Sequence, residues 1–191
     1  MPPATPPKVL VPIADGTEEI EAVCIIDVLR RAGADVTVAS VGGRQITASR
    51  GVNIVADCQI TDCQKIDFDL IVLPGGMPGA EHLRDSRPLT DLLRRHRAAD
   101  RWYGAICAAP AVVLSHHGLL GGCQATSHPA FRGQLTDGQA DQARVVVDGK
   151  CVTSQGPGTA IEFALTLVTL LMGEARAAEV AAPMVLPRTN G

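Results

Sequence analysis

Short apolar runs alternate along the chain with longer segments in which apolar residues recur at helical spacing. Runs of the first kind are Lys8 to Ile13, Phe68 to Leu73 and Arg101 to Ile106. Such runs are typical of strands that are buried on both faces of a parallel sheet. Helical spacing is found in Thr17 to Ala32 and in Thr159 to Met172. The alternation predicts an α/β fold in which helices cover both faces of a mostly parallel sheet.

Weaker patterns predict the remaining elements. We expect further strands or ribbons at Asp35 to Val41, Gln45 to Val55, Gln124 to Ser127, Arg144 to Val147 and Lys150 to Ser154, the last two joined by a hairpin turn at Asp148-Gly149. We expect further helices at Ala80 to Ala99, Ala108 to Leu114 and Glu174 to Ala182. No repeat or linker interrupts residues 8 to 187, which predict a single domain, and we expect residues 1 to 7 and 188 to 191 to be flexible ends.

Composition narrows the possible functions. The 191 residues are 46% hydrophobic, 19% charged and only 3% aromatic, with a formal net charge of -3. The chain therefore lacks the basic and aromatic surface with which proteins grip nucleic acids, and nucleic acid is not expected as its primary ligand. The longest stretch without Asp, Glu, Lys or Arg covers residues 102 to 131, but Pro, Gly and His interrupt it. We therefore expect a buried segment and no membrane partner.

Six cysteines stand at Cys24, Cys58, Cys63, Cys107, Cys123 and Cys151. The Pro-rich first residues do not have the pattern of a secretory signal, so we expect free thiols and a cytoplasmic location. No pair has C-x-x-C spacing, and we expect neither a metal site nor a cofactor. Cys58 and Cys63 are the one pair with any metal-binding or redox character.

Residues that could bind a ligand or take part in catalysis follow several of the expected strands. In open α/β sheets, ligands bind beyond the carboxyl ends of the strands. The segments that come directly after strands are Asp15 to Glu21, Pro74-Gly75-Gly76, Cys107-Ala108 and Ser127-His128. An acid, a glycine-lined backbone, a thiol and an imidazole are thus expected to meet at one edge of the sheet.

Two carboxyl groups fall on the apolar side of the first helix. At 100° per residue, Glu18 and Glu21 share the sector of Ala22 and Ile25, whereas Glu19 lies in the polar sector. A buried carboxylate is costly, so we expect such a group to be protonated or hydrogen-bonded. For Glu18 a capping role with Asp15 is an equal alternative. Glu21 lies a full turn into the helix and has no such alternative.

Cys107 is the candidate nucleophile. A thiol at a helix N-terminus is close to unpaired N–H groups, and we expect its pKa to lie well below the free value of about 8.5. The N–H groups of Ala108 and Gly76 are placed to bind an oxyanion, and His128 to move protons. A buried structural cysteine is the alternative for any single cysteine, but the strand-to-helix turn favours chemistry. We expect His82 and His96 to be solvated, and His116 and His117 to complement a helix dipole.

An ordered set of motifs supports this assignment. The segments VLVPIADGTEEIEAV, DLIVLPGGMPGA, AICAAP, TSHP and TSQGPGTAIEFAL resemble the ThiJ/PfpI superfamily, in the branch of the Parkinsonism-associated protein deglycase, over residues 8 to 187. The resemblance implies a flavodoxin-like homodimer with Cys107 at a strained nucleophile elbow. It also implies that Glu21 is a protonated acid touching the sulfur and that His128 is the nearby imidazole.

The resemblance further implies oxyanion or substrate-binding donors at Gly75, Gly76 and Ala108, and we add Glu18 to this group. The implied activity is the cofactor-free conversion of methylglyoxal and glyoxal to hydroxy acids, with repair of early glycation adducts. An alternative function is a redox-responsive sensor or chaperone, in which Cys107 is oxidised to a sulfinic acid. A cysteine peptidase is a weaker alternative, because the sequence shows no assembled triad.

Overall fold

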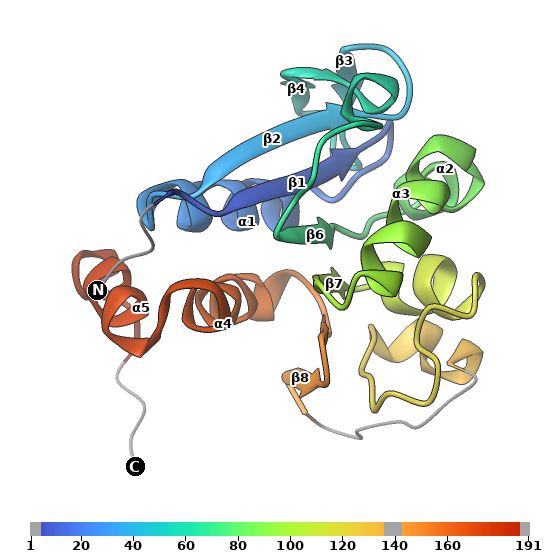
Figure 1. Ribbon diagram of the computed structural model, residues 1–191. Coiled ribbons are helices and arrows are strands. Elements are labelled where there is room, and N and C mark those ends of the chain that lie inside the picture. Colours follow the sequence, from blue (N-terminus) through green and yellow to red (C-terminus); the bar gives the residue numbers. More distant parts are fainter. Residues whose placement is uncertain (1–4, 136–142, 188–191) are drawn as a thin grey trace.

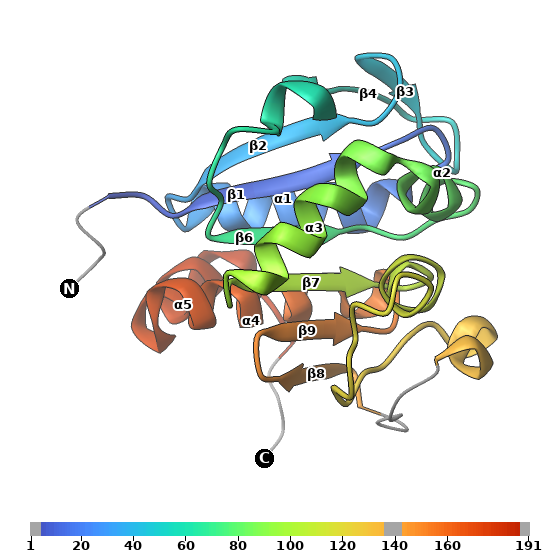
Figure 2. The same cartoon turned by 45° about the vertical axis from the view of Figure 1, so that its right-hand side comes forward.

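A seven-stranded sheet forms the centre of the computed structural model, which describes residues 5–135 and 143–187. Its order is β5-β2-β1-β6-β7-β9-β8, and every neighbouring pair is parallel except β8 and β9. Most of these strands follow one another across the view of Figure 2. The strands are β1 (Lys8–Ile13), β2 (Asp35–Ser40), β5 (Cys58–Gln59), β6 (Leu70–Leu73), β7 (Trp102–Ile106), β8 (Val145–Asp148) and β9 (Cys151–Ser154). The expected α/β fold with a mostly parallel sheet is confirmed.

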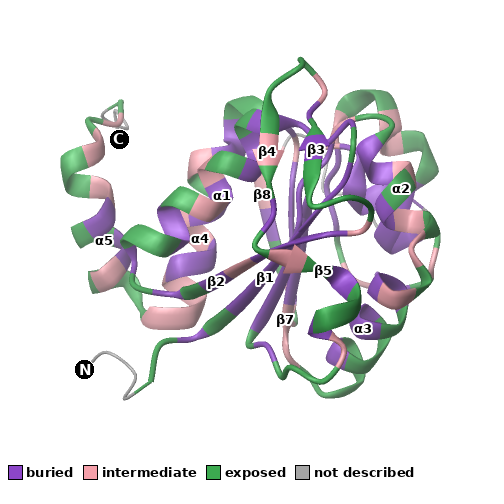
Figure 3. Cartoon of the chain, turned by 90° about the horizontal axis from the view of Figure 1, so that it is seen from above, coloured by how far each residue is buried: buried purple, intermediate pink, exposed green. Residues whose placement is uncertain are grey.

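Helices cover both faces of this sheet, giving three layers (Figures 1 and 3). One face carries α1 (Glu19–Arg31), α4 (Ala160–Met172) and α5 (Glu174–Ala181). The other carries α2 (Gly79–Asp85), α3 (Arg87–Ala98) and a π-helix (Pro110–Ser115). Short 3-10 helices lie at Ile60–Cys63, Pro129–Gln134, Pro157–Thr159 and Ala182–Met184, and β3 (Gln45–Thr47) pairs with β4 (Asn53–Val55) as a separate hairpin. No helix within the described ranges is long and apolar enough to cross a membrane.

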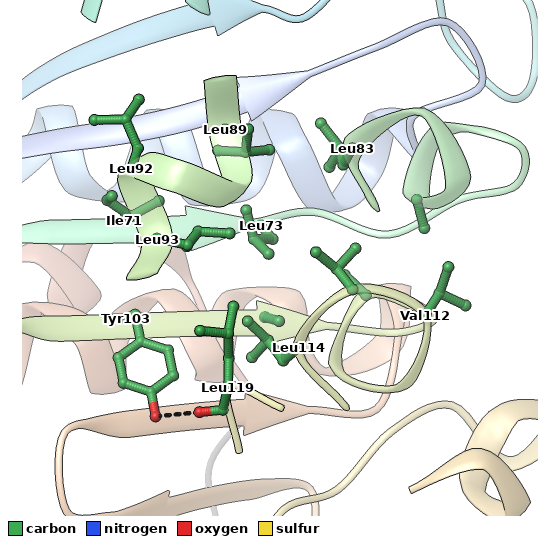
Figure 4. Close-up of a cluster of buried hydrophobic side chains, with 14 of the residues drawn as sticks. Ile71, Leu73, Leu83, Leu89, Leu92, Leu93, Tyr103, Val112, Leu114 and Leu119 are labelled. Atoms are coloured by element: carbon green, nitrogen blue, oxygen red, sulfur yellow. Dashed lines mark hydrogen bonds between the residues drawn. The ribbon is translucent and has the colours of Figure 1, made fainter. Parts of the chain in front are cut away.

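Each face of the sheet packs a separate apolar cluster against its helices. Figure 4 shows the cluster beneath α2 and α3, where Ile71 and Leu73 of β6 meet leucines of the helices. Tyr103 is the polar member of this cluster, and its hydroxyl donates to the Leu119 carbonyl over 2.8 Å. Each fully buried Leu or Ile contributes roughly 1.5–3 kcal/mol. These clusters fix the strands whose carboxyl ends carry the candidate site.

The register of the sheet aligns those carboxyl ends. Ile13 at the end of β1 pairs with Ser40 at the end of β2, and Ile106 at the end of β7 pairs with Ser154 at the end of β9. Before β1, the carbonyl of buried Pro7 accepts from the Asp35 N–H over 2.9 Å. The loops that follow the strands therefore meet at a common edge.

Two expected elements are wrong in detail. Ala80 to Ala99 is divided between two helices, because Ser86 caps the start of α3. Pro88, the second residue of α3, has no N–H with which to continue the hydrogen bonding of α2. Gln124 to Ser127 is no strand and forms only a single β-bridge, at Ala125. Side chains bind the backbone on either side of it: Asp148 accepts from the Gln124 N–H over 2.7 Å, and Thr153 Oγ1 accepts from the Thr126 N–H over 2.9 Å.

Candidate active site

Cys107 directly follows β7 and has a φ of +64°. A residue with a side chain rarely adopts this left-handed conformation, which costs on the order of 1–3 kcal/mol. Three hydrogen bonds hold it: the Cys107 N–H donates to the Ser154 carbonyl (3.0 Å), and the Cys107 carbonyl accepts from the His128 N–H (2.9 Å) and from Ser127 Oγ (2.7 Å). Neighbouring segments therefore maintain a strained elbow at this cysteine.

Glu21 projects from the first turns of α1 and is completely buried. Its Oε2 accepts a hydrogen bond from the Gly75 N–H over 2.8 Å, and its buried Oε1 has no hydrogen-bond partner in the described part of the chain. The carboxyl group also interacts with the Cys107 thiol. Burial raises the pKa of Glu21 to about 7, and the charge of Glu18 adds to the effect. Near neutral pH the carboxyl group therefore exists in both protonation states.

The Cys107 thiol does not have the low pKa that its helix N-terminal position predicts. Burial raises the pKa of Cys107 to about 12, and the charge of Glu21 and its hydrogen bond add to this increase. The N–H groups of Gly76 and Ala108 act in the opposite direction but are outweighed. The sequence prediction was wrong because it counted the N–H groups and left out the desolvation of the sulfur beside a carboxylate.

Gly75 and Gly76 follow β6 and lie where no side chain fits. A Cβ on Gly75 would lie 2.6 Å from the Cys107 Cβ and 2.9 Å from Glu21 Oε2. Gly76 has a φ of +89°, and a Cβ there would lie 2.3 Å from the backbone nitrogen of Glu18. This glycine pair therefore allows the backbone to approach the carboxyl group and the thiol closely.

Glu18 lies at the start of α1, where its side chain makes no capping hydrogen bond. The alternative of a capping box with Asp15 is not found, since Asp15 Oδ1 accepts from the Thr47 N–H instead (2.8 Å). Glu18 Oε2 lies 2.8 Å from Ser49 Oγ. Glu18 is 8% exposed and, through its charge, raises the pKa of Glu21.

Glu19 corrects the assignment of helix faces, because it is buried rather than solvated. Its Oε2 lies 2.8 Å from Ser49 Oγ, and its Oε1 accepts from the Arg50 N–H over 2.8 Å. Burial alone would raise the pKa of Glu19, but hydrogen bonds from the helix backbone, Ser49 and Arg50 lower it overall. The loop after β3 thus covers a part of α1 that the helix pattern assigns to solvent.

His128 is joined to the elbow through its backbone. Its Nδ1 accepts from the Ala130 N–H over 3.2 Å and caps the 3-10 helix that follows. An accepting Nδ1 assigns the proton of the neutral ring to Nε2, which leaves Nε2–H as a donor. The ring also lies against Gly156, where a Cβ would be 3.5 Å from Cδ2. The structure therefore brings His128 beside the Cys107 backbone with one ring nitrogen already used.

Ser127 and Ser154 hold the elbow, although the sequence gives neither of them a role. Ser127 is recognisable only as the neighbour of His128, and Ser154 becomes visible once β9 is paired with β7. His96 also differs from expectation: it is buried, and its Nε2 lies 2.7 Å from the Trp102 carbonyl. Within the described ranges, no group of three His, Cys, Asp or Glu side chains could hold a metal ion.

Comparison with known proteins places this site in a family context. Residues 7–170 match the DJ-1/PfpI family. Protein DJ-1 homolog B of Arabidopsis thaliana is 51% identical over 168 residues, which are 87% of this chain and 38% of that protein, so this chain spans well under half of that relative. Glutathione-independent glyoxalase DJR-1.2 of Caenorhabditis elegans is 34% identical over 182 residues, 94% of this chain and 96% of the relative.

Comparison with solved structures agrees with the family match. Toxoplasma gondii DJ-1, described as oxidized, superposes with a TM-score of 0.91 at 48% identity, covering 95% of this chain and all of that one. The family match covers most of the chain and includes the elbow, the glycine pair and both carboxyl groups of the site. The chain therefore belongs to the DJ-1/PfpI family.

Proposed function

We propose that this chain is a cofactor-independent glyoxalase and deglycase that converts methylglyoxal, glyoxal and early glycation adducts into hydroxy acids. The observation that carries the proposal is the contact between Cys107, at its strained elbow, and a buried Glu21 whose pKa is about 7. A carboxyl group that titrates near neutral pH is suited to accept and return protons. The name of the Caenorhabditis elegans relative, a glutathione-independent glyoxalase, supports the same class of reaction.

In the first step, Cys107 adds to the aldehyde carbon of the substrate. The Glu21 carboxylate takes the thiol proton as the sulfur–carbon bond forms, so no free thiolate has to accumulate beside a carboxylate. The aldehyde oxygen becomes an oxyanion, which the N–H groups of Gly76 and Ala108 bind beside the sulfur. Glu21 then returns its proton to this oxygen, which gives a neutral hemithioacetal and restores the Glu21 carboxylate.

In the second step, a proton leaves the carbon bonded to sulfur and a proton is added to the neighbouring carbonyl carbon. Glu21 takes the C–H proton as the base while His128 Nε2–H, whose Nδ1 is held by Ala130, protonates the neighbouring carbonyl oxygen, which gives an enediol. Glu21 then delivers its proton to the neighbouring carbon, and the hydroxyl on the carbon bonded to sulfur returns a proton to His128 as it becomes a carbonyl. The result is a thioester of the hydroxy acid, which water hydrolyses. Methylglyoxal plus water gives lactate, and no electrons leave the substrate, so the chemistry requires no redox partner.

The test of this proposal is product formation by the purified protein. Incubation with methylglyoxal, without glutathione and with a metal chelator present, should give lactate in amounts equal to the methylglyoxal consumed. The same incubation with Cys107→Ala should give none. Loss of methylglyoxal without formation of lactate would indicate simple adduct formation on surface amines. That outcome would contradict the proposed enzymatic conversion.

A second candidate function is redox sensing, as a sensor or chaperone, through the same thiol. Cys107 is partly exposed, and the similar Toxoplasma gondii DJ-1 structure is described as oxidized. The N–H groups beside the sulfur could bind the oxygens of a sulfinate, and protonated Glu21 could donate to them. After mild peroxide treatment, peptide mass spectrometry should find two added oxygens on Cys107. Oxidation of Cys123 ahead of Cys107 would contradict this function.

We also propose that the chain forms a homodimer through the outer surface of α1. Ile20 and Val23 on α1 are about half exposed, at 53% and 50%, and Val52 lies at 49% in the loop after β3. The contacts of Ser49 with Glu18 and Glu19 hold this loop against α1. Groups of large exposed apolar side chains are typical of surfaces at which proteins associate. Light scattering should give twice the 19.9 kDa chain mass, and Val23→Asp should give the single mass. A monomeric parent protein would exclude the dimer.

A further inference from the structure

Cys58 and Cys63 form a pair of neighbouring thiols at the edge of the sheet. Cys58 begins the edge strand β5, which Figure 3 shows as partly exposed, and Cys63 ends the 3-10 helix that follows. Their Sγ atoms lie 3.6 Å apart, and both residues are free cysteines. A disulfide bond is about 2.05 Å long, so closing it requires the sulfurs to approach by roughly 1.5 Å. Small side-chain adjustments can supply such a movement.

The backbone between the two cysteines keeps the thiols together. The Gln59 N–H donates to Asp62 Oδ2 over 3.1 Å, which closes a capping box around the helical turn. The Cys63 thiol in turn contacts the Gln59 carbonyl at 3.9 Å. The two sulfurs are therefore held in contact by local structure, and a bond between them would not require the chain to be rearranged.

The two thiols also differ in accessibility. Cys58 is partly exposed, whereas Cys63 is completely buried among core residues. A small oxidant therefore reaches Cys58 first. Burial raises the pKa of Cys63 to about 12, and the hydrogen bond and charge of Cys58 add to this increase. Conversion of Cys58 into a disulfide removes these two contributions and makes Cys63 easier to ionise.

This thiol pair is separate from the candidate active site. Cys58 lies on β5 and Cys107 follows β7, with β2, β1 and β6 between them. Neighbouring strands are about 4.8 Å apart, which puts the two positions roughly 19 Å from each other. Neither cysteine of the pair can bond to Cys107 in the folded protein, so any reaction of the pair is independent of the proposed catalysis.

We propose that Cys58 and Cys63 form a redox-active dithiol that closes to an intramolecular disulfide in reaction with a low-molecular-weight disulfide. The Cys58 thiolate attacks one sulfur of the small disulfide, its S–S bond breaks, and one small thiol leaves with the electron pair. The Cys63 thiolate then attacks Cys58 Sγ and expels the second small thiol. The cysteines together lose two protons and two electrons, and the small disulfide is reduced to two thiols.

The experiment uses the full chain carrying Cys107→Ala, so that the active-site thiol cannot react, and treats it with oxidised glutathione. Intact-mass spectrometry should show the loss of two hydrogens with no glutathione retained. Peptide mapping should identify a Cys58–Cys63 link that dithiothreitol removes. Glutathione that remains bound to Cys58 while Cys63 is present, or a chain that does not react, would overturn the proposal.

Two matched variants separate the steps. With Cys63→Ala added, the first step should still occur, and Cys58 should stop as a stable mixed disulfide with glutathione. With Cys58→Ala added, buried Cys63 should remain a thiol. Cys58→Ala changes a partly exposed side chain and leaves the buried core residues unchanged. If Cys63→Ala does not fold, the Cys58→Ala chain alone therefore tests the order of attack. Rapid reaction of Cys63 in the Cys58→Ala chain would overturn the assigned order of attack.

Discussion

Replacing Cys107 with alanine is expected to abolish the conversion of methylglyoxal, lowering kcat/KM by about a thousandfold or more. The reason is that the proposed reaction passes through a covalent bond to Sγ, and the variant has no atom that can form it. Glu21 and the N–H groups of Gly76 and Ala108 remain in place, but they have no bound intermediate on which to act. The measurement is the rate of lactate formation at several methylglyoxal concentrations.

The matched control is Cys24→Ala, which removes a partly buried thiol from α1. That variant should retain the rate of the parent protein, because Cys24 forms no bond to the substrate in the proposed reaction and interacts with Glu21 only through charge. Circular dichroism and thermal unfolding should show that both variants are folded. Lactate formation by Cys107→Ala at the parent rate would show that the chemistry lies elsewhere in the chain.

Much of the site could be predicted because it depends on local periodicity and on strand ends. The helical repeat alone places Glu21 on the apolar face of α1 with Ala22 and Ile25, and the structure buries all three completely. The position of Cys107 directly after a strand likewise predicts a turn, and the structure places it directly after β7. The strained elbow is what the family resemblance implies, and the φ of +64° agrees with it. The helix face and the strand end are properties of a few consecutive residues, whereas hydrogen bonds from Ser127, His128 and Ser154 maintain the strain at Cys107.

The features that could not be predicted depend on segments that are distant in sequence. Glu19 lies on the polar face of α1 by periodicity, but the Ser49–Arg50 loop covers it. His96 lies in an Arg-rich helix, yet the Trp102 carbonyl and the core enclose its ring. The pKa of Cys107 depends in the same way on how deeply the folded chain buries the thiol beside Glu21.

The second large effect concerns the pH dependence of stability. The pKa of Glu21 rises from 4.5 to about 7 in the folded protein, because burial favours the protonated carboxyl group. The stability that it contributes is fully present below the unfolded pKa and is lost as the pH rises through about 7. The shift corresponds to about 3 kcal/mol. Between about pH 4 and about pH 8, the parent protein should therefore lose about 3 kcal/mol more unfolding free energy than Glu21→Gln.

Urea unfolding of the parent protein and Glu21→Gln across this pH range measures the difference in unfolding free energy. The contributions of titratable groups that both proteins share cancel in this difference. Glu19→Gln is the matched control, since the pKa of Glu19 is lowered and its contribution to stability is lost as the pH falls. Relative to Glu19→Gln, the parent should therefore gain stability with rising pH, which is the opposite sign. Equal pH dependence in the parent and Glu21→Gln would mean that Glu21 keeps an ordinary pKa. Its carboxylate would then be a weaker base than the proposed mechanism requires for taking protons from the Cys107 thiol and the substrate.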